Sequence, residues 1–148
     1  MNGVQFNMYM DQVMELVNLP NPEIWREKTR GTTEFREPEH ENVASGEGFN
    51  ANIRFPFVGN GLVAIHYDMA EGTGYDTVKA TLTREYGEAV PFDAAKIGNG
   101  RYAVDDDGDL KDCVEMIEAE GMTIVLEKDN DGDVDVTIPD PTAAYINA

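Results

Sequence analysis

The segment 122–138 constrains the fold most, because it has the pattern of two strands joined by a tight polar turn. Met122–Lys128 and Asp133–Ile138 flank Asp129-Asn130-Asp131-Gly132, whose residue types favour chain reversal. In the second run Val134, Val136 and Ile138 take one side, and Asp133, Asp135 and Thr137 take the other. Such alternation is typical of a strand with one buried face, so the segment predicts a β-hairpin.

A second hairpin is predicted earlier in the chain. Residues 49–57 alternate, with every aromatic side chain on one side, and Pro56 favours an edge strand or a strand end. The turn Gly59-Asn60-Gly61 leads into a second strand, Leu62–Asp68. An amphipathic helix over about 76–86 follows, and then a short strand over 100–104.

The remaining segments predict helices and a loop. Residues 6–18 have apolar side chains at helical spacing, and Asn21-Pro22-Glu23 has the residues of a helix start, so 6–31 is expected to form a helical hairpin. Residues 32–48 lack a sustained period and are expected to form a long loop. Asp107 or Asp109 can cap a helix that ends at Gly121; its apolar side would be Leu110, Cys113, Val114 and Ile117.

These elements predict a single α+β domain over residues 1–148. A helical hairpin would precede a mostly antiparallel sheet of about five strands: two hairpins plus one short strand, with helices packed on one face. The α+β body would span 49–141, and 142–148 would be a short tail.

Acidic charge is concentrated near the C-terminus. The net charge is −18, and the last 44 residues carry −12 of it, with 14 acidic and 2 basic residues. Such a field repels nucleic acid and anionic membranes and favours cationic partners. The N-terminal residues lack a signal-peptide pattern and no segment is long and apolar enough for a membrane span, so we expect a cytoplasmic protein.

No pattern of catalytic or metal-binding residues stands out. The aspartate runs 105–109 and 129–133 resemble calcium-loop fragments, but Val114 or Ile138 falls where an EF-hand has its final glutamate. His40, which we expect to be solvated in the loop, His66 and Cys113 have no zinc spacing. No nucleophile has a recognisable base, so we expect neither an enzyme nor a bound metal or cofactor.

The acidic C-terminal third is the candidate site. Glu115 and Glu118 would share one helix face, and Asp133 and Asp135 one strand face. We expect a non-enzymatic binding or inhibitor protein that docks on a basic protein surface, such as that of a nuclease or another nucleic-acid-binding protein. In composition it resembles the acidic DNA-mimic inhibitors of phages and mobile elements, and acidic toxin-immunity proteins. The candidate residues are Asp105, Asp106, Asp107, Asp109, Asp112, Glu115, Glu118, Asp129, Asp131, Asp133 and Asp135.

Two alternatives remain open at this point. The acidity could serve solubility alone, in an accessory module that binds a protein or a small ligand through its hairpins or the 32–48 loop. Alternatively, Asp105–Asp109 with Glu127 or Asp129 could hold a divalent metal weakly in a metal-dependent enzyme.

Overall fold

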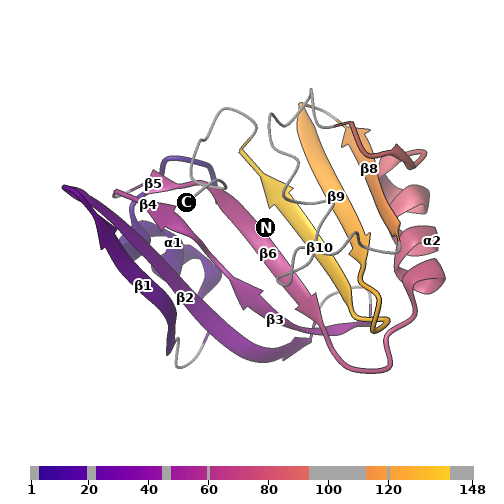
Figure 1. Ribbon diagram of the computed structural model, residues 1–148, viewed down its shortest axis with the longest axis horizontal. Coiled ribbons are helices and arrows are strands. Elements are labelled where there is room, and N and C mark those ends of the chain that lie inside the picture. The colour runs from indigo at the N-terminus through magenta and orange to yellow at the C-terminus, as the bar shows by residue number, and fades with distance from the viewer. Residues whose placement is uncertain are drawn as a thin grey trace.

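One large antiparallel sheet dominates the structure (Figure 1). The computed structural model describes residues 4–19, 23–44, 48–59, 61–93, 113–119 and 121–140. In these residues ten strands join in the order β5-β4-β2-β3-β6-β10-β9-β8-β7, and β1 pairs with β2. The elements are α1 (Met10–Val17), β1 (Glu23–Arg30), β2 (Thr33–Ala44), β3 (Asn50–Arg54), β4 (Phe57–Val58), β5 (Gly61–Leu62), β6 (Ala64–Met69), α2 (Tyr75–Tyr86), β7 (Val90–Pro91), β8 (Cys113–Ala119), β9 (Met122–Lys128) and β10 (Val134–Pro139).

Both helices cover the same face of the sheet, at opposite ends. Val13 of α1 packs into a core cluster with Ile53 and other buried residues of the first half of the sheet. Val78 of α2 packs into a second cluster formed with β8, β9 and β10. Tyr67 and Ile138 contact both clusters, so the core is continuous along this face. Because side chains alternate along a strand, the intervening residues point to the other face.

The expected helical hairpin and long loop are wrong: beyond α1, these residues form the β1–β2 hairpin. Gly31 begins its two-residue turn with a φ of 64°, which favours glycine. Cross-strand contacts hold β1 to β2, although β1 is largely exposed and its apolar residues do not recur at regular spacing. Arg36 Nε lies 3.4 Å from Glu27 Oε2, and the Lys28 ammonium lies 5.7 Å from the centre of the Phe35 ring.

The expected acidic helix is also wrong over its described part, because residues 113–119 form strand β8. β8 pairs with β9 along its whole length, from Cys113 opposite Lys128 to Ala119 opposite Met122. Adjacent residues Met116 and Ile117 are both buried, on opposite faces of the sheet. The proposed cap and the rest of 105–112 lie outside the described residues, as do the predicted strand 100–104 and the tail 142–148.

The expected fold class, α+β with about five strands behind a helical hairpin, is therefore overturned. The strands predicted around the turn 129–132 do form, as β9 and β10. A helix was also predicted correctly at α2. The predicted hairpin 49–68 contains β3 to β6, in which β3 pairs with β6 and the two-residue strands β4 and β5 form a small hairpin.

Candidate functional site

The face of the sheet opposite the helices carries two rows of polar side chains, which we call the polar array. Residues directly opposite each other in neighbouring strands point to the same face. The antiparallel register aligns Glu39, Arg54, His66 and Thr137 in one row across β2, β3, β6 and β10. It aligns Asn52, Asp68, Asp135 and Glu127 in the next row, across β3, β6, β10 and β9.

Arg54 lies at the centre of three carboxylates. Its Nε is 3.6 Å from Glu39 and 3.9 Å from Glu37, and its Nη2 is 3.8 Å from Asp68. The centre of the Trp25 ring lies 4.0 Å from the guanidinium carbon of Arg54. Burial nevertheless raises the pKa of Glu39, because desolvation outweighs the attraction of Arg54 and neighbouring carboxylates add repulsion. One cation therefore does not neutralise the acids around it.

His66 links the two rows of the polar array. Its Nδ1 is 2.7 Å from Thr137 Oγ1, and its Nε2 is 3.6 Å from Asp135 Oδ1. A hydroxyl, an imidazole and a carboxylate in contact have the composition of a catalytic triad. However, Thr137 is only 2% exposed, so its hydroxyl is not accessible to a substrate. We therefore interpret these contacts as structural.

Two carboxyl groups face each other at the centre of the second row. Asp68 of β6 lies directly opposite Asp135 of β10. Burial raises the pKa of Asp68, and repulsion by Asp135 raises the pKa further, against the attraction of Arg54 and His66. Like charges directly opposite each other destabilise a sheet.

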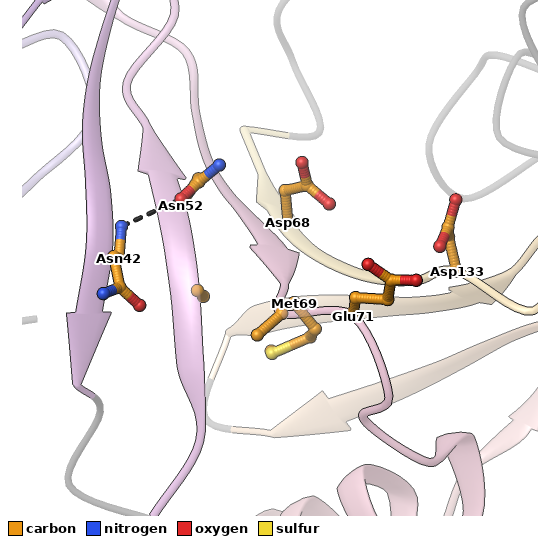
Figure 2. A pocket seen from close by; sticks show the side chains of 8 residues that line it. Asn42, Asn52, Asp68, Met69, Glu71 and Asp133 are labelled. Atoms are coloured by element: carbon orange, nitrogen blue, oxygen red, sulfur yellow. Dashed lines mark hydrogen bonds between the residues drawn. The ribbon is translucent and has the colours of Figure 1, made fainter.

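A hollow of about 460 Å³ opens beside this pair, where the start of β3 lies next to the end of β6 (Figure 2). Figure 2 shows the carboxylates of Asp68, Glu71 and Asp133 around the opening. On the other side, the Asn42 backbone amide donates a hydrogen bond to Asn52 Oδ1, with a separation of 2.8 Å. None of the described lining residues is basic; they are Asn42, Ala51, Asn52, Asp68, Met69, Ala70, Glu71 and Asp133.

The β9–β10 turn brings three aspartates together next to the hollow. Carboxylate oxygens of Asp129, Asp131 and Asp133 lie within 4.8 Å of one another. Asp129 Oδ1 accepts hydrogen bonds from the backbone amides of Asp131 and Asp133, at 2.9 and 3.0 Å, and so holds the turn. Repulsion by Asp129, together with some burial, raises the pKa of Asp133. Calcium takes six to eight oxygen ligands, and with one oxygen from each carboxylate the cluster supplies three of them.

The predicted acidic face is only partly brought together. Asp129, Asp131, Asp133 and Asp135 lie near one another. Glu115 and Glu118 do not share a face, because residues three apart in a strand point to opposite sides. The five remaining predicted residues, Asp105, Asp106, Asp107, Asp109 and Asp112, lie outside the described residues.

Glu115 points instead to the helix-covered face, where it joins α2 to β8. Tyr75 Oη donates a hydrogen bond to Glu115 Oε1 at 2.7 Å, and Lys79 Nζ donates to Oε2 at 2.9 Å. Burial opposes ionisation of Glu115, but hydrogen bonds from Tyr75, Lys79 and Cys113 outweigh it and lower the pKa. Glu115 therefore has a structural role.

Sequence reasoning missed Asp68 and Glu71 as lining residues of the hollow. Asp68 was visible as a polar residue at the end of a predicted strand, but its approach to Asp135 depends on the β6–β10 pairing. His40 was also placed wrongly. It is 2% exposed, and its ring lies edge-on to Phe55, with the ring centres 5.9 Å apart.

Comparisons with protein-family models, curated proteins and solved structures found no match. In the part of the chain that the structure describes, no helix has the length and apolar character needed to cross a membrane.

Proposed function

We propose that this protein is a non-enzymatic binding or inhibitor protein, and that it docks an anionic surface on a cationic site of a partner protein. The surface, which we call the acidic edge, consists of the hollow and the adjoining turn: Asp68, Glu71, Asp129, Asp131, Asp133 and Asp135. The observation that carries the proposal is the convergence of carboxylates on a hollow whose described lining contains no basic side chain.

The electrostatics of the acidic edge support a cationic occupant. Mutual repulsion helps to raise the pKa of Asp68 and of Asp133, so the negative charge is only partly compensated within the described protein. A lysine or arginine side chain from a partner would relieve this repulsion. A groove that normally binds nucleic acid has such side chains, which is why a nuclease or another nucleic-acid-binding protein in the cytoplasm is the expected partner class.

The experiment is capture of partners from an extract of the native host, with two charge-matched variants. Glu71→Lys/Asp131→Lys changes two exposed residues of the acidic edge. Glu85→Lys/Glu88→Lys changes two exposed residues at the end of α2 and after it, and alters the net charge equally. All three proteins are compared at increasing salt, and duplex DNA is added as a competitor.

We expect the wild type and the α2 variant to capture the same basic protein, and duplex DNA to displace it. The acidic-edge variant should bind this protein about tenfold more weakly, because two exposed ion pairs contribute about 0.2–1 kcal/mol each and about 1.4 kcal/mol is a factor of ten. Partners that are neutral or acidic, held with an affinity that does not depend on salt, would contradict the proposal.

A further inference from the structure

The pair Asp68 and Asp135 connects the hollow to the polar array. Asp68 lines the hollow, and it also lies directly opposite Asp135 in the neighbouring strand. Side chains directly opposite each other in an antiparallel pair have Cβ atoms about 4.5–5.5 Å apart, so the two carboxyl groups come close enough for the charge of one to oppose ionisation of the other. The side chain of Asp135 is 22% exposed and that of Asp68 is 40% exposed, so water screens the pair in part.

Charged groups surround the pair on every neighbouring strand. From β3, Arg54 contacts Asp68; from β6 itself, His66 contacts Asp135. From β9, Glu127 lies opposite Asp135. Three acids therefore adjoin one another in a single row: Asp68, Asp135 and Glu127. Two more, Asp133 and Glu71, lie at the hollow. Glu37 and Glu39 lie around Arg54. Since Arg54 is shared among three carboxylates, it does not fully compensate Asp68.

We infer that Asp68 and Asp135 hold one proton between them at mildly acidic pH, and that a cationic group that docks in the hollow displaces this proton. The pair is thus a proton-linked regulator of the acidic edge. Its lower charge at mildly acidic pH weakens docking, and its full charge at neutral pH strengthens docking. The displacement rests on the proposed function, whereas the shared proton does not.

The shared proton is tested by following the side-chain carboxyl carbons of the free protein by NMR as pH changes. We expect the pair to titrate in two separate steps, the upper one above the ordinary aspartate range of about 3.9. Asp135→Asn should lower the midpoint of Asp68, whereas the control Asp131→Asn in the exposed turn should leave both steps unchanged. The wild-type titration decides the question even if Asp135→Asn does not fold. Two independent titrations in the ordinary range would overturn the inference.

The displacement is tested by calorimetry with a hexa-arginine peptide at several pH values, in two buffers of different ionisation enthalpy. We expect proton release below the upper midpoint of the pair, and an affinity that rises there by about tenfold per pH unit. Binding without proton release would overturn the displacement and leave the proposed function standing. Absence of binding at every pH would overturn both the docking and the displacement, while the carboxyl titration would still decide the shared proton.

Discussion

At the residue scale, Glu115 shows how the pairing of strands decides what an acidic side chain does. It belongs to the most acidic third of the chain, yet Tyr75 and Lys79 hold it on the helix-covered face. An argument from charge density alone assigns such a residue to a binding surface. The contact from α2, 36 to 40 residues away along the chain, assigns it to the fold.

Tyr75→Phe should therefore destabilise the protein by about 1.5–3 kcal/mol at pH 7, the range expected for a hydrogen bond to a charged group. The pKa of Glu115 is lowered in the folded protein, so its stabilisation is present above the pKa of the unfolded chain and is lost as pH falls through the folded value. The difference between wild type and variant should shrink towards pH 3. Urea unfolding at both pH values measures it, and an equal difference at both would contradict the assignment.

The effect of Asp68→Asn on stability at pH 7 should have the opposite sign. The pKa of Asp68 is raised by folding, so its contribution to stability is present at low pH and is lost as pH rises through the folded value. Asparagine imitates the protonated group, and the variant should be more stable than wild type by about 0.2–1 kcal/mol at pH 7. Denaturant unfolding should show this gain disappearing near pH 3. A loss of stability at pH 7 would mean that the contact with Arg54 outweighs the repulsion.

At the scale of elements, sequence patterns succeeded where one strand face is buried and failed where it is not. β10 alternates cleanly because Val134 and Val136 pack against the core while Asp135 points to the other face. β1 has no such period, since its described side chains are largely exposed and hold to β2 by cross-strand contacts. The local helix-start pattern at 21–23 therefore predicted a helix, whereas the pairing of β1 with β2 that forms instead is not visible in the sequence.

The prediction for the residues of β8 failed for a different reason: both faces of this strand are partly buried. Strands buried on two faces give continuous apolar runs, which cannot be distinguished from a helix by period alone. As with the fold, the locally encoded part of the candidate site was predictable and the part that depends on strand pairing was not. The β9–β10 turn and its aspartates follow from the local sequence, whereas Asp68 and Glu71 join them only through the β6–β10 pairing.

Met116→Ala tests β8 as a strand, because the expected helix did not place Met116 on its apolar side. Met116 is 1% exposed, so the substitution should cost about 2–5 kcal/mol in unfolding free energy. Glu118→Ala, on the same face of β8 but exposed, is the comparison variant and should cost less than Met116→Ala, because it leaves no cavity in the core. Similar small effects of both substitutions in denaturant unfolding would argue against the strand.

At the scale of the whole molecule, the net charge of −18 opposes the compact state through self-repulsion. Salt should relieve this repulsion, so the melting temperature should rise between about 10 mM and 500 mM NaCl, where the screening length becomes shorter than about 5 Å. A stabilisation of about 1 kcal/mol corresponds to about 2–4 °C for a chain of this size. Calorimetry at several salt concentrations measures it. A melting temperature that falls or stays constant would show that repulsion is already balanced.

The same charge could serve solubility alone, in which case no part of the surface would be preferred by a cation. The measurement that separates the two explanations most directly is an NMR amide spectrum titrated with a hexa-arginine peptide at neutral pH and low salt. Our account predicts shifts concentrated at the acidic edge, at Asp68, Glu71 and residues 129–133, and little change at the exposed acids Glu85 and Glu88. Small shifts spread evenly over all exposed acidic residues would contradict it.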